Sequence, residues 1–203
     1  MIAIIDYGVG NLFSLKSSLK YIGEDAVVTS EKNIIHDAEK IILPGVGAFG
    51  DAAEKLTKTG LKDVILDEVK NGKYLLGICL GMQLLFEKSY EYGVHDGLGL
   101  IKGEVVPIKD VIPSDYKIPH ICWNSLHFKG GKSRIFKHIN DGDYVYFVHS
   151  YYGANCDEFV TAVTDYGAEL TASVENGNVF GCQFHPEKSG DVGLKILKAF
   201  AEA

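Results

Sequence analysis

The chain has 203 residues, of which 46% are hydrophobic and 23% are charged, and its formal net charge is −7 at pH 7. A chain of this length suits one domain, over residues 1–203, and buries about 70% of the surface that its unfolded form exposes. The acidic charge is spread out without a basic patch, and no apolar run approaches the length of a membrane span, so nucleic-acid and membrane partners are not expected.

The first half of the chain alternates short apolar strands with amphipathic helices. In the first helix, for example, Leu12, Leu15 and Leu19 recur at helical spacing, and Gly23 ends the segment. This alternation predicts a parallel sheet that is covered by helices on both faces. The expected strands are 2–6, 26–30, 40–43 and 74–78, and the expected helices are 10–22, 51–58, 61–70 and 81–89.

The second half of the chain changes character and is rich in strands. The residues 176–178 read as a hairpin turn, and a helix is expected over 191–202 at the end of the chain. We therefore expect an α/β fold whose sheet gains antiparallel strands in its C-terminal half. The expected strands are 99–107, 117–122, 144–148, 159–164, 169–175 and 179–184.

A G-x-C-x-G turn over residues 77–81 joins the apolar strand 74–78 to the helix behind it. Gly77 and Gly81 flank Cys79, as a sharp strand-to-helix reversal requires, and such a "nucleophile elbow" lifts the central side chain out of the sheet. The positive end of the helix dipole at this place is expected to lower the pKa of the thiol and so to favour the thiolate. Most free cysteines are simply small buried hydrophobes, so the turn alone leaves both interpretations open.

A second segment, about a hundred residues downstream, supplies a base and an acid. A cysteine nucleophile needs a base for its proton and a third group that orients the base. In His185-Pro186-Glu187 the acid follows the histidine by two residues, and the proline is expected to keep the backbone extended, so that both side chains point the same way. Cys79, His185 and Glu187 are thus the predicted catalytic residues.

A glycine-rich loop follows the expected strand 40–43. It includes Gly45, Gly47 and Gly50, and bare backbone of this kind can offer N–H groups to an oxyanion. The predicted donors are Val46 and Gly47, together with Leu80, the residue after the nucleophile. A phosphate cradle is disfavoured because the loop lacks the Lys-Ser/Thr ending of a P-loop, whereas a plain glycine-rich turn stays open.

The elbow cysteine and the His-Pro-Glu segment together make the chain resemble the class I (triad) glutamine amidotransferases. The segments 6–12, 43–49, 123–124, 146–151 and 185–189 make it similar, more narrowly, to the HisH family, the glutaminase subunits of imidazole glycerol phosphate synthase. The resemblance covers essentially the whole chain and implies a doubly wound open sheet. It also implies hydrolysis of glutamine through a cysteine thioester, without a metal or an organic cofactor. Cys122, before Trp123, departs from the glycine that is usual in the family.

The resemblance also implies residues that bind glutamine. From the residues alone, Gln83 is one helical turn after Cys79 and faces the same side, whereas Glu91 reads as a charged helix end. His149, at a strand end, suits the rim of a pocket, although such a histidine is more often a satisfied core residue. The residues that match the family's glutamine site are Gly45, Gln83, Glu91, His149, Ser150 and Tyr151.

A partner that receives the ammonia is implied as well: a HisF-type (β/α)8-barrel cyclase, in a heterodimer. This enzyme makes imidazole glycerol phosphate and an aminoimidazole carboxamide ribonucleotide in histidine biosynthesis. The loop 44–47 is the suspected switch between resting and active states. The residues that match the family's interface are Asn11, Trp123, Asn124 and Lys188.

Two sequence features bear on the cellular compartment of the protein. The four cysteines, Cys79, Cys122, Cys156 and Cys182, lack C-x-x-C spacing, and the first residues lack the positive flank of a signal peptide. Both features favour the reducing cytoplasm.

Three other functions remain as alternatives. The chain can serve a different client synthase, such as a sugar-modifying enzyme; it can be a cysteine hydrolase of another class; or it can be a non-enzymatic α/β module.

Overall fold

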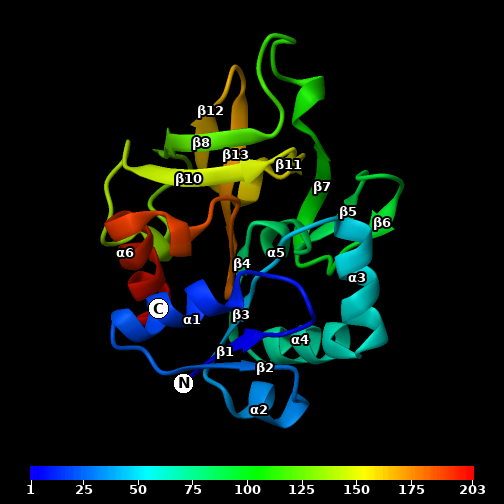
Figure 1. Cartoon of the computed structure of the whole chain (residues 1–203), viewed down its shortest axis with the longest axis vertical. Helices are drawn as coiled ribbons and strands as arrows, with labels where there is room; N and C mark the ends of the chain where they lie inside the picture. Colours follow the sequence, from blue (N-terminus) through cyan, green and yellow to red (C-terminus); the bar gives the residue numbers. More distant parts are fainter.

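The structure is a computed structural model that describes all 203 residues, and its centre is an eight-stranded sheet (Figure 1). The strands are β1 (Ile2–Ile5), β2 (Ala26–Thr29), β3 (Lys40–Leu43), β4 (Tyr74–Ile78), β9 (His127–Phe128), β12 (Val160–Asp165), β13 (Glu169–Asn176) and β14 (Val179–Cys182). Their order is β2-β1-β3-β4-β14-β13-β12-β9. The first five in this order pair in parallel, and the last three add antiparallel pairs. The predicted α/β fold class is therefore confirmed.

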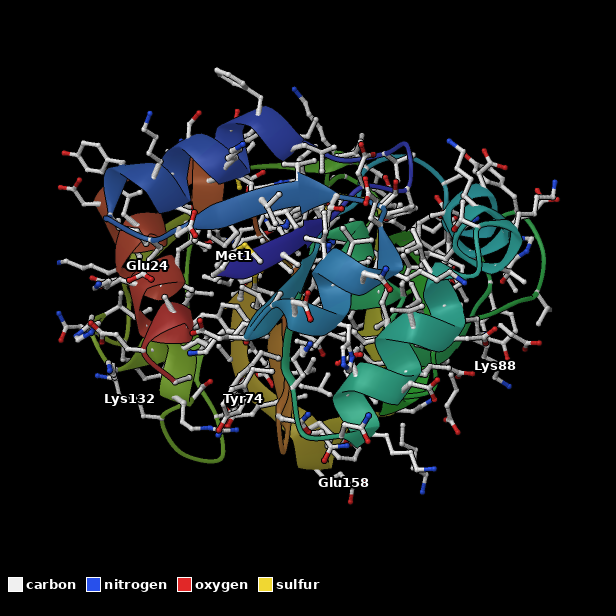
Figure 2. All side chains as sticks on the ribbon, turned by 90° about the horizontal axis from the view of Figure 1, so that it is seen from below. Met1, Glu24, Tyr74, Lys88, Lys132 and Glu158 are labelled. Atoms are coloured by element: carbon white, nitrogen blue, oxygen red, sulfur yellow. The ribbon has the colours of Figure 1, made fainter.

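Helices cover both faces of the sheet, because alternate residues of its strands enter two separate cores. Ile4 packs in one core with Leu15 of α1 (Leu12–Tyr21), whereas Ile5 packs in the other with Ile65 of α4 (Leu61–Lys70). Seen from below, α1 and α6 (Gly190–Ala201) lie to one side of β1, and α4 lies to the other (Figure 2). The remaining helices are α2 (Lys32–Asp37), which was not predicted, α3 (Phe49–Lys58) and α5 (Leu80–Gln83). No helix is long and apolar enough to span a membrane.

Two smaller sheets lie beside the main one. One has the order β11-β7-β5-β6, and the other pairs β8 with β10. The strands predicted at 99–107 and 144–148 thus form, but outside the main sheet, and the strand predicted at 117–122 lies at 120–125. The bounds are β5 (Phe86–Ser89), β6 (His95–Asp96), β7 (Ile101–Pro107), β8 (His120–Ser125), β10 (Tyr144–His149) and β11 (Tyr151–Ala154), with 3₁₀ turns η1 (Ile108–Asp110), η2 (Arg134–Phe136), η3 (Asp157–Phe159) and η4 (Pro186–Lys188).

The helix predicted over 81–89 is wrong beyond its first turn. Helix α5 ends at Gln83, and residues 86–89 form β5, which pairs in parallel with β7 and antiparallel with β6. The Phe86 ring occupies the place where a side chain at Gly153 would stand. A short apolar run such as 84–86 fits a buried helix or a buried strand equally well, and here the pairing partners decide.

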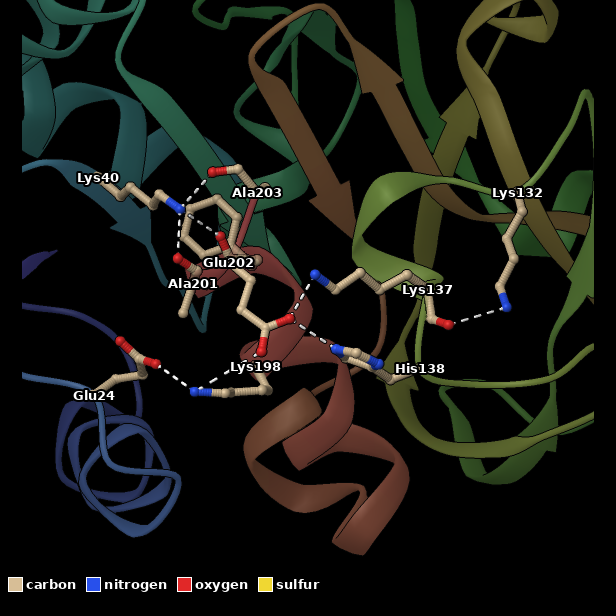
Figure 3. Close-up of polar contacts among 10 residues, drawn as sticks. Glu24, Lys40, Lys132, Lys137, His138, Lys198, Ala201, Glu202 and Ala203 are labelled. Atoms are coloured by element: carbon tan, nitrogen blue, oxygen red, sulfur yellow. Dashed lines mark hydrogen bonds and ion pairs between the residues drawn. The ribbon is translucent and has the colours of Figure 1, made fainter.

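Lys40 of β3 anchors the C-terminal helix. Its Nζ donates to the backbone oxygens of Phe200 at 3.0 Å, Ala201 at 2.6 Å and Ala203 at 2.8 Å (Figure 3). Phe200 and Ala201 end α6, where carbonyls lack a following helical turn, and a cation at a helix C-terminus also complements the dipole. Burial lowers the pKa of Lys40. A second, exposed group of charges surrounds Glu202, which pairs with Lys137, His138 and Lys198.

Candidate active site

Cys79 lies in a sharp turn at the end of β4. Its backbone has φ 54° and ψ −111°, in a region that residues with a side chain rarely occupy. Both flanking glycines are needed: a Cβ at Gly77 would stand 2.6 Å from the Gly81 oxygen, and a Cβ at Gly81 would overlap the oxygen of Leu43. The turn therefore has the strand–turn–helix geometry of a nucleophile elbow.

The helix behind the elbow has only four residues, from Leu80 to Gln83. A macrodipole needs several aligned turns, so the long-helix contribution expected from the sequence is small here. What the turn does supply is backbone: the N–H of Leu80 opens the helix and has no intrahelical acceptor. The turn therefore offers a backbone N–H beside Cys79 rather than the field of a long helix.

His185 and Glu187 form the predicted pair. His185 Nδ1 lies 2.8 Å from Glu187 Oε1, and both side chains are almost fully buried. The expected extended backbone is wrong, because Pro186 opens the 3₁₀ turn η4, in which the Lys188 N–H donates to the His185 carbonyl. Proline is favoured at the first position of such a turn, and the turn still brings the acid back to the ring.

The imidazole of His185 is held in its charged form. Burial lowers the pKa of His185, but the neighbouring Cys79 and the Glu187 carboxylate outweigh it and raise the pKa to about 9. Nε2 of His185 and Oε2 of Glu187 are buried without a hydrogen-bond partner. At neutral pH the ring thus carries a proton that it can give to a leaving group.

A cavity of about 360 Å³ opens over these side chains, a size that suits a small molecule. It brings the cysteine, the histidine, part of the glycine-rich loop and the segment 149–151 together. No group of three or more His, Cys, Asp or Glu side chains is arranged to hold a metal ion. The lining residues are Val46, Gly47, Cys79, Leu80, Gln83, Glu91, Pro119, Val148, His149, Ser150, Tyr151, His185 and Lys188.

Gln83 and Glu91 both reach the cavity from the positions that the sequence assigned to substrate binding. Gln83 is buried, and its Nε2 donates to the Tyr151 carbonyl at 3.1 Å. Glu91 is not at a helix end, because it lies in the turn after β5; its Oε2 accepts the Phe49 N–H at 2.6 Å. Burial raises the pKa of Glu91.

The glycine-rich loop is held from behind by Tyr7, a residue to which the sequence assigned no role. The Tyr7 hydroxyl donates to the Pro44 carbonyl at 2.8 Å, and burial raises the pKa of Tyr7. A Cβ at Gly45 would stand 2.8 Å from that hydroxyl and 2.9 Å from Leu80 Cβ, so Gly45 packs behind the cavity instead of lining it. Gly47 has φ +96°, and Val46 is exposed.

Two further buried polar residues were missed. Gln183 is fully buried, and its Nε2 donates to Cys79 Sγ at 3.8 Å and its Oε1 accepts from Gln83 at 3.0 Å. His120 Nδ1 lies 2.9 Å from His149 Nε2. Gln183 had a signal in the sequence, since it is a lone amide between apolar residues two positions before His185, whereas nothing near His120 pointed to His149.

Of the four predicted interface residues, only Lys188 lines the cavity. Its Nζ lies 5.9 Å from the Tyr146 ring centre, and Trp123 meets the same ring edge-on at 6.1 Å. Trp123 is half exposed, so it is not a core tryptophan. Asn124 donates to the Asp165 carbonyl at 2.7 Å, and Asn11 precedes α1, which packs against η4.

Comparisons with known proteins agree with this geometry. Residues 3–203 match the family Glutamine amidotransferase class-I. Imidazole glycerol phosphate synthase subunit HisH of Caldanaerobacter subterraneus subsp. tengcongensis is 55% identical over 203 residues, 100% of this chain and 98% of that protein. The protein of the same name from Wolinella succinogenes is 48% identical over 204 residues, 100% of this chain and 99% of that protein.

Solved structures give the same fold. A crystal structure of a glutamine amidotransferase superposes with a TM-score of 0.76 at 20% identity, over 99% of this chain and 100% of that one. PurLQS from Thermotoga maritima superposes with a TM-score of 0.75 at 24% identity, over 99% and 97% of the two chains. At these identities the likeness supports the fold, whereas the family rests on the sequence matches: the chain belongs to the class-I glutamine amidotransferases and, within them, to the family of HisH subunits of imidazole glycerol phosphate synthase.

Proposed function

We propose that this chain hydrolyses glutamine to glutamate and ammonia through a thioester on Cys79. The observation that carries the proposal is the cavity of about 360 Å³ that Cys79 and His185 share, with Glu187 2.8 Å behind the imidazole. A nucleophile, a base and an orienting acid are the parts that acyl transfer from an amide requires. In this proposal residues 1–203 act as one amidotransferase domain.

The reaction proceeds in two halves. The Cys79 thiolate forms a bond to the side-chain carboxamide carbon, and the carbonyl electron pair moves to oxygen, where the N–H groups of Val46, Gly47 and Leu80 stabilise it. His185 gives its proton to the leaving nitrogen, ammonia departs, and a γ-glutamyl thioester remains. His185 then takes a proton from water, which attacks the thioester, and the carbon–sulfur bond breaks to release glutamate and the thiolate. Glu187 orients the imidazole and stabilises its charge.

Glutamine is held, in this proposal, by the residues around the cavity that match the family's site. Glu91 is the one carboxylate among the lining residues, so it suits the α-ammonium group of the substrate. Gln83, His149, Ser150 and Tyr151 provide amide, imidazole, hydroxyl and backbone groups at the same wall. Gly45 contributes by letting the loop approach Leu80 closely.

The ammonia passes, we infer, to a HisF-type (β/α)8-barrel cyclase in the cytoplasm, which makes imidazole glycerol phosphate and an aminoimidazole carboxamide ribonucleotide. The proposed docking surface contains Asn11, Trp123, Asn124 and Lys188. It is supported by the half-exposed Trp123 and the exposed Ile121, which together present apolar surface on β8. Large aromatic anchors of this kind dominate many interfaces.

The test is glutamate release from glutamine by the chain alone and with a histidine-pathway cyclase plus its nucleotide ligand. We expect little release by the chain alone and a large rise with the liganded cyclase. Rapid release by the chain alone would indicate a different client synthase. The proposed glutaminase activity would be refuted if neither mixture released glutamate and a chloroketone analogue of glutamine did not label Cys79. The Cys79→Ser chain is the control for specific labelling.

A further inference from the structure

A row of hydrogen bonds begins on β8 at Asn124, and its direction is fixed by backbone groups. The Ser125 N–H donates to Asn124 Oδ1 at 2.9 Å, so the amide nitrogen must lie on the other side. That nitrogen donates to the Asp165 carbonyl at 2.7 Å, and its second hydrogen faces His120 Nε2 at 3.5 Å. His120 Nε2 is therefore an acceptor, and the proton of this ring is on Nδ1.

The second ring in the row is fixed from the opposite end. His149 Nδ1 lies 2.8 Å from the Tyr151 carbonyl, which can only accept, so this nitrogen carries the proton. His149 Nε2 is then an acceptor, and His120 Nδ1 donates to it at 2.9 Å. Both rings are neutral, because burial lowers the pKa of His120 to about 4 and that of His149 to about 3. One arrangement of protons satisfies every one of these atoms.

The row continues beyond Tyr151 to the nucleophile. The Tyr151 carbonyl accepts a second bond, from Gln83 Nε2 at 3.1 Å. Gln83 Nε2 also donates to Gln183 Oε1 at 3.0 Å, and Gln183 Nε2 donates to Cys79 Sγ at 3.8 Å. The orientation of the Tyr151 carbonyl thus decides where the Gln83 amide points inside the cavity.

Packing holds the first ring in place. His120 is fully buried and stacks on Tyr166 at 4.0 Å and on Phe147 at 5.0 Å between ring centres. The loss of its N–H would leave His149 Nε2 without its protein donor. His120 itself does not line the cavity.

We propose that His120 is a positioning residue: through its bond to His149 it fixes the Tyr151 carbonyl, and thereby the Gln83 amide, in the geometry that binds glutamine, with Asn124 as the outer anchor of the row. The inference rests on the proposed glutaminase function. A histidine pair that only stabilised the fold would change the unfolding free energy without a specific effect on glutamine binding.

The kinetic test compares two substitutions of His120, each assayed with the liganded cyclase. His120→Phe keeps the stacked ring and removes the donor, and we expect it to raise KM for glutamine about tenfold with a smaller change in kcat. His120→Asn keeps an N–H near the position of Nδ1, and we expect it to restore most of the KM. A His120→Phe chain that is folded by circular dichroism and has the wild-type KM would overturn the proposal.

A second measurement does not depend on activity. Long-range ¹H–¹⁵N spectra of the wild-type chain are expected to show His149 neutral with its proton on Nδ1, the minor tautomer in water, and with Nε2 accepting a hydrogen bond. In His120→Phe the Nε2 resonance is expected to shift to that of an imidazole nitrogen without a donor. A proton on Nε2 of His149 would overturn the proposal. If the wild-type chain released no glutamate even with the liganded cyclase, and the chloroketone did not label Cys79, the proposed function would fail, and these spectra would still test the bond between the two rings.

Discussion

At the scale of single residues, the proposed chemistry requires Cys79 and His185 to act as one unit. Substitution of either by alanine is expected to lower kcat for glutamate release by about a thousandfold or more, and the double variant is expected to lose little beyond that. Glu187→Gln, which keeps the shape but weakens the support of the imidazolium, is expected to lose less than either. Additive losses in the double variant would contradict a shared step.

The contributions of His120 and His149 to stability depend on pH in the opposite sense to that of His185. His120 and His149 have pKa values lowered to about 4 and about 3, against 6.5 in an unfolded chain. Between pH 6.5 and 4 the unfolded state therefore binds more protons, and the free energy of unfolding falls as the pH falls. His185, raised to about 9, stabilises fully below pH 6.5 and loses that contribution as the pH rises to 9.

The expected outcome is a maximum of stability near pH 6.5 to 7, measured by urea unfolding between pH 4 and 9. The slope per group is at most about 1.4 kcal/mol per pH unit. His120→Phe removes one titrating group, so its acid limb is expected to be shallower than that of the wild type. An acid limb with an unchanged slope would show that folding does not lower the pKa of His120.

At the scale of elements, sequence periodicity located most of the helices and strands, because their apolar spacing is imposed by the two cores. It did not separate a helix from the α5–β5 pair, since Phe86 satisfies both patterns and only the long-range pairing with β7 distinguishes them. For the same reason the sequence could not assign β8 and β10 to a sheet of their own. Pairing partners far apart in the chain leave no local signal.

Lys40 joins two elements that are distant in sequence, β3 and the end of α6. Lys40→Met keeps the length of the side chain but leaves the oxygens of Phe200, Ala201 and Ala203 without this donor. We expect a loss of about 1 to 3 kcal/mol in unfolding free energy, measured with urea. The matched control is Glu202→Gln in the exposed group of charges, for which a clearly smaller change is expected because exposed pairs are screened. Equal losses would contradict the anchoring role.

At the scale of the whole molecule, the proximity of Cys79, His185 and Glu187 was predictable because each lies in its own local motif, whereas the hydrogen bonds around them were not. Gln183 bonds to Gln83, 100 residues away, and His120 bonds to His149, 29 residues away. No spacing in the sequence predicts such pairs. The proposed role of Tyr7 behind the loop was hidden in the same way. The fold class, in contrast, followed from strand and helix order alone.

The proposed assembly makes one prediction at this scale. Trp123→Ala, at a half-exposed side chain on β8, is expected to weaken binding to the cyclase by about 2 kcal/mol or more, measured by titration calorimetry. Labelling of Cys79 by the chloroketone in the isolated chain is expected to be unchanged, which separates docking from damage to the site. Unchanged cyclase affinity would place the docking surface elsewhere.

The last strand of the chain lies in the middle of the sheet, between β4 and β13. During synthesis, a nascent chain that has emerged only as far as residue 150 therefore holds β4 with one edge unpaired and Cys79 without His185, its proposed base. Insertion of β14 completes the sheet and the site in one event, since the Cys79 N–H then donates to the Cys182 carbonyl at 2.8 Å. Pairing over such sequence distances is slow, and an open strand edge invites aggregation. A chain released from a ribosome that stalls before the final 25 residues would thus lack His185 and expose a strand edge that favours aggregation.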